Sequence, residues 1–163
     1  HMQAMSGASG NGGPFVLAGQ LLRLWAAGSI CCYRGEKVKA ERLVTWGPFG
    51  WIRNPLYLGN GLIGLGWSLM TGYLLMSMVY IFFFVLLYMG IIIPHEERFL
   101  EGKFGEAYLR YRAETPMLMP RRFPQKADFQ ASFHTIILWK SERHSLYITI
   151  LGTMLFFIKY LWN

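Results

Sequence analysis

The feature of this sequence that most constrains its fold is a long apolar segment, residues 56–93, enclosed by two short motifs of charged and turn-forming residues. Residues 56–70 are largely apolar, Thr71 and Gly72 give one credible break, and residues 73–93 are apolar again without any charge. A single helix of that length would be about twice as long as a bilayer is thick. Two helices joined by a minimal turn are therefore expected to cross a membrane and return, which brings the two motifs together on one side of it.

The composition of the whole chain agrees with a membrane protein. Of its 163 residues 53% are apolar and 17% are aromatic, and sixteen Lys and Arg outnumber nine Asp and Glu, for a net charge of +7. These charges lie in blocks between the apolar runs, which is typical of loops that face an anionic cytoplasmic leaflet and not of a nucleic-acid interface. We therefore expect an integral membrane protein whose partners include membrane lipids and no nucleic acid.

The chain is expected to form a single domain over residues 15–163. Residues 1–14 are left out of it, because the first two residues resemble the remnant of an expression tag and the Gly-rich segment after them is interpreted as a flexible lead-in. Cys31 and Cys32 are adjacent and offer no metal-ligand spacing, so no metal site is predicted.

Four membrane spans are predicted, at about residues 15–33, 56–71, 73–93 and 145–162. Basic residues flank both ends of the central hairpin and its turn is uncharged, so these ends are assigned to the cytoplasmic side and both chain termini to the other side. Arg23 lies near the middle of the first span, where a charge is costly unless it faces a protein-lined or watery cavity. It is therefore either functional or a sign that this helix packs inside a bundle.

An amphipathic helix is predicted over residues 96–112, where large apolar or aromatic residues recur at helical spacing. Residues 117–124 are expected to be extended, and residues 129–139 could form an interfacial helix. The predicted fold class is thus an all-α integral membrane protein, with about four transmembrane helices and a cytoplasmic amphipathic helix that completes a ligand pocket.

The hairpin places Arg53, Asn54 and Tyr57 of the first motif next to Glu96 and Glu97 of the second. Each feature also has a plainer interpretation, since Arg53 could be one more cytoplasmic charge and the two carboxylates could start a solvated helix. Adjacent residues on a helix point about 100° apart, so at most one of the two glutamates is expected to face a given pocket. Together, a guanidinium, carboxylates and aromatic rings suit a zwitterionic ligand that carries an aromatic base.

The two motifs resemble those of the isoprenylcysteine carboxyl methyltransferase and phospholipid methyltransferase superfamily. The resemblance covers roughly residues 20–124 and is specific, because two separated motifs agree in order and spacing; the segments around Arg23 and Val44 resemble its bacterial members. The residues that carry it are Gly47, Pro48, Phe49, Arg53, Asn54, Pro55, Leu56, Tyr57, Leu58 and Gly59 in the first motif, and Glu96, Glu97, Leu100, Phe104, Gly105, Tyr108, Tyr111 and Pro120 in the second.

This resemblance implies a methyltransferase of the bacterial inner membrane that binds S-adenosylmethionine in a cytoplasm-facing pocket between the two motifs. The pocket would replace a Rossmann fold, and the sequence has no Gly-rich Rossmann fingerprint between a strand and a helix. The cofactor-binding residues that the resemblance implies are Arg53, Asn54, Pro55, Tyr57, Gly59, Glu96, Glu97, Tyr108, Tyr111 and Arg112.

Two departures from the superfamily pattern bear on the substrate. The first motif commonly has His where this chain has Asn54, so hydrogen bonding is expected there instead of proton transfer. The eukaryotic carboxyl methyltransferases also have Arg at the position of Ile92, so a prenylated cysteine carboxylate is a less secure acceptor than another lipid-like molecule.

Methyl transfer from a sulfonium chiefly requires that the acceptor is aligned in line with the methyl group and that water is excluded. A carboxylate acceptor would need a cation, for which Arg53 and Arg23 are candidates. An ammonium acceptor would first have to lose a proton, for which Glu97 is the candidate. We therefore predict methyl transfer to a lipid-like or prenylated acceptor, with Glu97 and Arg53 as catalytic residues and the apolar tail of the acceptor entering laterally between spans.

A membrane reductase and a non-catalytic scaffold are the alternatives. Membrane sterol reductases share a similar C-terminal pattern and bind NADPH, although this chain is short for a sterol-sized cavity. A scaffold would have kept the fold without binding a cofactor. Bacterial members of the superfamily often have a further span before the one predicted here, so lipid or a second copy of the chain could cover an exposed flank.

Overall fold

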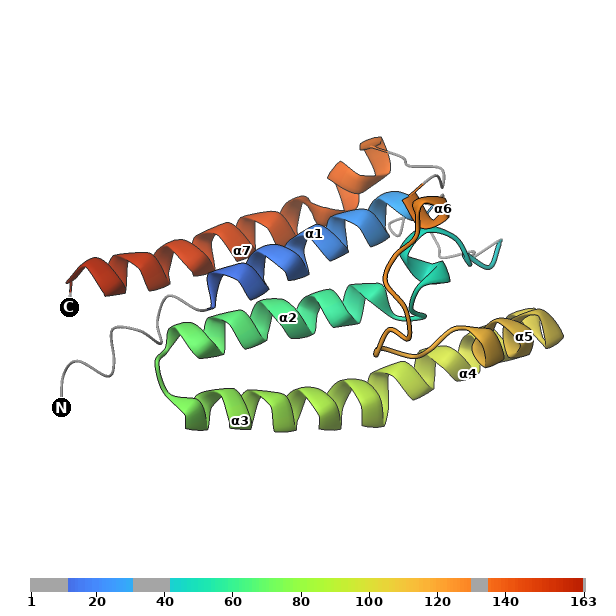
Figure 1. The fold of residues 1–163 in the computed structure, drawn as a ribbon, viewed down its shortest axis with the longest axis horizontal. Coiled ribbons are helices and arrows are strands. Elements are labelled where there is room, and N and C mark those ends of the chain that lie inside the picture. The colour runs from blue at the N-terminus through green and yellow to red at the C-terminus, as the bar shows by residue number, and fades with distance from the viewer. Residues whose placement is uncertain (1–11, 31–41, 130–134, 163) are drawn as a thin grey trace.

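The computed structural model of the chain describes residues 12–30, 42–129 and 135–162, and within these residues it contains helices and no strand (Figure 1). Helices α1, α2 and α3 lie side by side, α7 runs along α1, and α4 and α5 extend beyond one end of this bundle. The elements are α1 (Gly13–Ser29), the 3-10 helix η1 (Gly47–Gly50), α2 (Pro55–Met70), α3 (Leu74–Phe84), the π-helix η2 (Val85–Ile92), α4 (Ile93–Phe104), α5 (Glu106–Glu114), α6 (Lys126–Phe129) and α7 (Thr135–Trp162).

The predicted helical hairpin is present. Pro55 begins α2 in the first helical turn, where its missing N–H costs nothing. At the other end α2 stops at Met70, and Gly72 takes a positive φ of 77° that reverses the chain into α3. The turn at Thr71 and Gly72 was therefore predicted correctly from the sequence.

The second half of the hairpin differs from the prediction. A break was expected after residue 93, followed by one helix over residues 96–112, but α3, η2 and α4 run on as one helix from Leu74 to Phe104. Pro94 is accommodated in the first turn of α4, directly after eight residues of π-helix that already depart from the α-helical hydrogen-bond pattern. The break falls instead at Gly105, whose φ of 52° separates α4 from α5.

The last helix also differs from the prediction. Instead of an interfacial segment followed by a span at residues 145–162, α7 is one helix of 28 residues, and it continues through the polar residues around Glu142. Glu142 does not interrupt it because its carboxylate is buried against α1. Residues 31–33 of the first predicted span and residues 130–134 of the predicted interfacial segment lie outside the described residues. Most of the predicted lead-in lies outside them as well.

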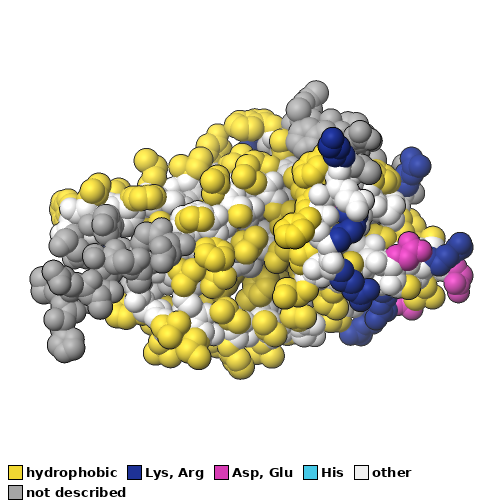
Figure 2. All heavy atoms as spheres, in the orientation of Figure 1, with side chains coloured by type: hydrophobic (Ala, Val, Ile, Leu, Met, Phe, Trp, Pro, Cys, Tyr) yellow, Lys and Arg dark blue, Asp and Glu magenta, His cyan; other side chains and the backbone are white. Residues whose placement is uncertain are grey.

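In the described part of the chain one helix, residues 74–104, is long and apolar enough to cross a membrane. Its large side chains are mostly exposed, for example Leu74 at 74% and Phe82 at 62%. Figure 2 shows hydrophobic side chains over most of the length of the molecule and charged side chains gathered toward the end that carries α4 and α5. The predicted number of four spans is not confirmed by these criteria, since α1 and α2 have 17 and 16 residues.

Helices α1 and α2 approach each other at glycine. A Cβ atom on Gly59 would lie 2.5 Å from Cγ of Arg23 and 2.8 Å from the carbonyl oxygen of Gly19, so no larger side chain fits without movement. The same holds in reverse at Gly19, where a Cβ would lie 2.6 Å from the carbonyl oxygen of Gly59. This contact brings the aliphatic part of Arg23 directly onto α2 and fixes the spacing of the two helices.

Candidate functional site

A buried ion pair joins the two sequence motifs. Nε of Arg53 donates a hydrogen bond to Oε1 of Glu97 at 2.9 Å, and the two side chains are only 9% and 7% exposed. Arg53 lies two residues before the start of α2, while Glu97 lies in the second turn of α4 and is buried. Glu96 is partly exposed, so the two adjacent glutamates have different surroundings, as the helical geometry predicted.

The segment after α5 closes over this ion pair. The NH1 group of Arg53 donates to the carbonyl oxygens of Arg112 at 2.8 Å and of Thr115 at 2.6 Å. Its backbone N–H donates to the carbonyl oxygen of Pro116 at 2.8 Å. Because Nε, NH1 and the backbone N–H of Arg53 are all used in this way, its position is set by α4 and by the chain after α5 together.

Asn54 takes part in the same cluster through its side-chain amide. Nδ2 donates to the carbonyl oxygen of Met117 at 3.3 Å and lies 3.5 Å from Oε1 of Glu97. The side chain of Asn54 thus makes hydrogen bonds, and its role in binding a cofactor stays a prediction. Arg112 is more peripheral, with Nε 3.8 Å from Oε2 of Glu97 and a side chain that is 48% exposed.

Tyr108 and Tyr111 of α5 pack beneath the cluster. Tyr108 is 1% exposed, and its pKa is raised to about 12, first by burial and then by the nearby charge of Glu97. The hydroxyl of Tyr111 donates to the carbonyl oxygen of Phe49 at 2.7 Å, and burial raises its pKa as well. Both phenols therefore stay neutral at physiological pH, and that of Tyr111 acts as a hydrogen-bond donor.

The remaining residues of the predicted set lie along α2. Pro55 is buried at its start, and the ring of Tyr57 lies 5.2 Å from the ring of Tyr88 in η2. Gly59 faces α1 at the close contact described above. The structure thus gives Gly59 a packing role, and its part in binding a cofactor stays a prediction.

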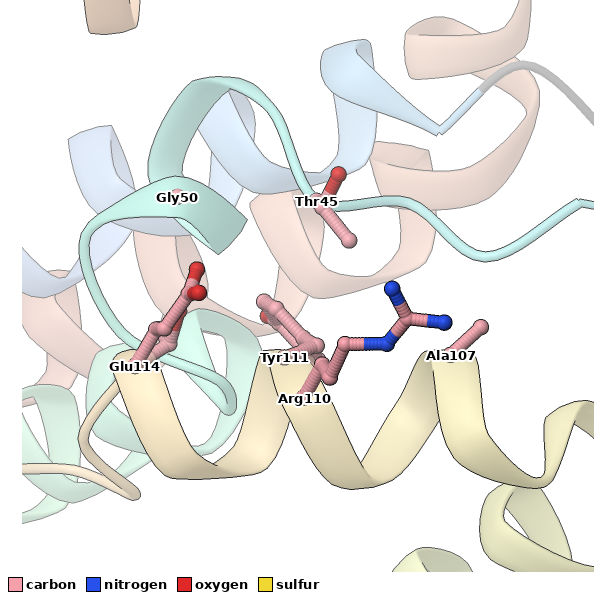
Figure 3. A pocket seen from close by; sticks show the side chains of 7 residues that line it. Thr45, Gly50, Ala107, Arg110, Tyr111 and Glu114 are labelled. Atoms are coloured by element: carbon pink, nitrogen blue, oxygen red, sulfur yellow. The ribbon is translucent and has the colours of Figure 1, made fainter.

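A polar pocket of about 560 Å³ lies on the far side of Tyr111, between α5 and η1 (Figure 3). Arg110 and Glu114, one turn apart on α5, stand at its wall with opposite charges, and Thr45 lies opposite them. Of the predicted cofactor residues Tyr111 is the one that lines it. The signal that could have found Arg110 and Glu114 is their spacing, because residues 107, 110, 111 and 114 share one face of a helix.

The chain after this site folds back over the first motif. The carboxylate of Asp128 receives hydrogen bonds from both terminal nitrogens of Arg122 and, at 2.8 Å, from the backbone N–H of Gln125. Nε1 of Trp51 donates to the carbonyl oxygen of Arg122, and the ring of Phe129 stacks on Trp25 with centroids 4.7 Å apart. The sequence predicted an extended segment here but not its docking on the first motif.

Acid is expected to release this docked segment. The hydrogen bonds from Arg122, helped by the N–H of Gln125, hold the pKa of Asp128 below its usual value near 3.8. A carboxyl group with a lowered pKa stabilises the folded form at pH values above its ordinary pKa, and this contribution is lost as the pH falls through the folded pKa. Protection from hydrogen exchange, measured relative to the unfolded chain at the same pH, should therefore persist at the bonded N–H groups of Gln125 and Asp128 from neutral pH to about pH 4 and be lost below it.

The variant Asp128→Asn should already exchange fast at pH 7, whereas Lys126→Gln, an exposed neighbour on α6, should behave like the wild type. Slow exchange at pH 7 in Asp128→Asn would show that the ion pair does not hold the segment.

Arg23, the other cation considered for an acceptor carboxylate, is already paired. Its guanidinium binds Glu142 of α7, with Nε–Oε2 and NH2–Oε1 distances of 3.0 Å. Glu142 was missed at the sequence level, although an arginine inside an apolar bundle requires a partner. Among the described residues no group of three or more His, Cys, Asp or Glu side chains is placed to hold a metal ion.

Comparison with known proteins gives a family and two similar curated proteins. The model of the family "Phospholipid methyltransferase" matches residues 12–107. The cobalt-zinc-cadmium resistance protein CzcN of Cupriavidus metallidurans (strain ATCC 43123 / DSM 2839 / NBRC 102507 / CH34) is 39% identical over 101 residues, and the nickel-cobalt-cadmium resistance protein NccN of Alcaligenes xylosoxydans xylosoxydans is 35% identical over 101 residues. Each match covers 61% of this chain and 43% of the relative's own length. No solved structure matches the chain.

Proposed function

Because the family model matches more than half of it, the chain belongs to the phospholipid methyltransferase family, and we propose that it is an integral membrane methyltransferase that uses S-adenosylmethionine. The observation that carries this proposal furthest is the buried pair of Arg53 and Glu97. Two residues 44 positions apart, one from each motif, meet at the end of an apolar hairpin where a soluble cofactor and a membrane-dissolved acceptor can both arrive.

The residues around this pair fit the chemistry of the cofactor. The neighbouring pocket has the size of a small-molecule site, and it offers a guanidinium at Arg110, a carboxylate at Glu114 and the ring of Tyr111. A zwitterionic amino-acid group suits the two charges and an aromatic base suits the ring. We propose that the cofactor is held along this pocket and the adjoining cluster of Arg53, Asn54, Pro55, Tyr57, Gly59, Glu96, Glu97, Tyr108, Tyr111 and Arg112.

When bound, S-adenosylmethionine supplies an electrophilic methyl group. What remains for the chain is to orient the acceptor, exclude water and accept a proton when the acceptor is an amine. Glu97 is our candidate for the proton acceptor or for an acceptor-side charge, and the ion pair with Arg53 holds its carboxylate in place. Tyr108, buried close to the same carboxylate and neutral well above physiological pH, adds no further charge beside Glu97.

We propose that α1, α2, the continuous segment of α3 and η2 (residues 74–92) and α7 lie across the membrane, with α4, α5 and the two motifs facing the cytoplasm. The described parts of α1 and α2 are about 25 Å long at 1.5 Å per residue, close to the hydrocarbon thickness. Large exposed side chains on α7, such as Ile148 and Leu155 at about 60%, suit a lipid environment. A lipid-like or prenylated acceptor would then reach the site from within the bilayer.

The relatives CzcN and NccN are named for resistance to metals. A membrane methyltransferase could serve such a phenotype by changing the headgroup of a lipid or another membrane-dissolved acceptor. This role for the present chain is part of the proposal and requires the acceptor to be identified.

The direct test is calorimetric binding of S-adenosylmethionine and S-adenosylhomocysteine to the detergent-purified protein, with NADPH as the contrast. We expect micromolar binding of the two sulfur compounds and none of NADPH. Arg110→Ala and Glu114→Ala, which each remove one charged group from the pocket, should weaken binding about tenfold or more. Glu106→Ala, at an exposed position of the same helix outside the pocket lining, is the matched control and should bind like the wild type.

NADPH binding in place of S-adenosylmethionine would favour a reductase. Absence of any cofactor binding in folded protein would favour a scaffold. Wild-type affinity in Arg110→Ala and Glu114→Ala would remove this pocket from the proposed site and leave only the cluster around Arg53.

A further inference from the structure

A second buried ion pair lies inside the apolar bundle, away from the candidate site. Nε and NH2 of Arg23 in α1 donate hydrogen bonds to the two carboxylate oxygens of Glu142 in α7, and the closest N–O distance is 2.9 Å. The two side chains are 14% and 3% exposed. The contact spans 119 positions of sequence and joins the first described helix to the last.

The pair continues into a chain of hydrogen bonds across the bundle. The NH1 group of Arg23 donates to Oδ1 of Asn60 on α2, and Nδ2 of Asn60 donates to the hydroxyl of Tyr88 on η2 at 3.3 Å. The ring of Tyr88 packs against that of Tyr57 at 5.2 Å and against that of Phe84 at 4.5 Å. Four helical elements, α7, α1, α2 and η2, are thereby tied together by polar contacts at one level.

Stability alone does not explain such a network. A buried ion pair is often no more stabilising than a well-packed apolar pair of the same size, because both charges lose their hydration. What it does supply is a unique arrangement, since each donor fits one acceptor and a helix that rotates or slides leaves a charge unpaired. In an apolar bundle the free-energy cost of such an unpaired charge is large, so the helix packing that keeps both charges paired is strongly favoured.

The network ends beside the candidate site. Tyr57 and Asn60 lie three and six residues beyond Asn54, which is about 4.5 and 9 Å along α2 from the residue that contacts Glu97. Tyr88 lies in the π-helix, a conformation that is frequent at functional sites because it re-aims side chains. Along α2, Tyr57 therefore lies between the level of Asn54 and that of Asn60, and its ring contacts that of Tyr88.

We propose that Arg23 and Glu142 are positioning residues, through which α7 sets the placement of Tyr57 and Tyr88 by way of Asn60. Helix α7 thereby contributes to the geometry of the site, although it lies beyond the residues matched by the family model. The consequence for cofactor binding rests on the proposed function, whereas the positioning of the two rings does not.

The test places 3-fluorotyrosine at position 57 or 88 of the full chain in detergent and records its fluorine resonance. We expect Glu142→Gln to shift or broaden both resonances and Glu142→Asp, which keeps the charge, to restore them in part. Arg143→Gln, which removes an exposed charge from the adjacent position of α7, is the matched control and should leave both resonances unchanged.

A second variant separates positioning from mere stability. The pair Arg23→Met with Glu142→Leu removes both charges together and keeps apolar volume, so the helices should stay packed while Asn60 loses its donor. The Tyr88 resonance should still move although the melting temperature is retained. Resonances of both tyrosines that match the wild type in Glu142→Gln and in the double variant would overturn the proposal.

Titration of the same samples with S-adenosylhomocysteine tests the functional part. We expect affinity to fall about tenfold in Glu142→Gln and to stay within about twofold in Arg143→Gln. Moved resonances with unchanged affinity would overturn the link to the site. Absence of binding to the wild type would instead contradict the proposed function, and the resonances would still decide whether Glu142 positions the rings.

Discussion

Replacement of Glu97 by leucine is expected to lower the free energy of unfolding by about 3–5 kcal/mol and to abolish cofactor binding, the largest effect we expect from one polar side chain in this protein. Leucine fills the buried space but leaves the Arg53 guanidinium, only 9% exposed, without an anionic partner. Asn54 loses an acceptor for its side-chain amide at the same time. Denaturant unfolding in detergent and calorimetric titration with S-adenosylhomocysteine measure the two effects.

The matched control is Glu101→Gln on the same helix. Glu101 pairs with Arg112 at 3.3 Å, but both side chains are more than 40% exposed, so the expected loss of stability is below about 1 kcal/mol. Unfolding of Glu97→Leu within about 1 kcal/mol of the wild type would show that Arg53 finds other compensation, and the pair could not be regarded as the centre of the site.

A double variant separates the structural role of this pair from its functional role. Arg53→Met together with Glu97→Leu removes both buried charges, and much of the lost stability should return. Binding should not return, because the guanidinium and the carboxylate are what we propose the ligand and acceptor require. Recovery of binding along with stability would mean that the pair only holds the two motifs together.

The meeting of the two motifs could be predicted because it follows from one strong pattern. A break at Thr71 and Gly72 between two apolar runs permits only a hairpin, and a hairpin brings Arg53 and Glu97 to the same end. Helical geometry also predicted that Glu96 and Glu97 would differ. It could not say which of them faces inward, since that depends on how α4 is rotated against α2.

The parts that could not be predicted depend on register between distant segments. The position of Arg23 inside an apolar segment indicated a buried charge that needs compensation. Its partner, Glu142, could be identified only once the position of α7 along α1 was known. Docking of Arg122 and Asp128 on the first motif likewise follows from backbone contacts such as that between Arg53 and Pro116, which leave no periodic signal in the sequence. The continuity of the helix through Pro94 depends on the π-helix before it, which has no distinctive composition here.

Replacement of Gly59 by leucine is expected to have the second large effect, because it separates α1 from α2. Even a Cβ atom at this position would lie 2.5 Å from Cγ of Arg23 and 2.8 Å from the backbone oxygen of Gly19, and the backbone of a packed helix cannot move aside locally. Overpacking of this kind costs about 1–3 kcal/mol for Gly59→Ala and more for leucine, measured by denaturant unfolding in detergent. Gly102→Ala in α4, where nothing lies within 4 Å of the added atom, is the control and should be stabilising by up to about 1 kcal/mol.

The same variants decide how Gly59 contributes to binding. If it acts by packing, Gly59→Ala should displace the stem of Arg23 from α2 and disturb its contacts with Asn60 and Glu142, so that affinity for S-adenosylhomocysteine falls together with stability. If Gly59 instead makes room for the cofactor itself, as its place in the first motif predicts, affinity should fall with unfolding unchanged. Because Cβ contacts at Gly59 are made with α1, we expect the first result, and the second would reassign this face of α2 from helix packing to the binding site.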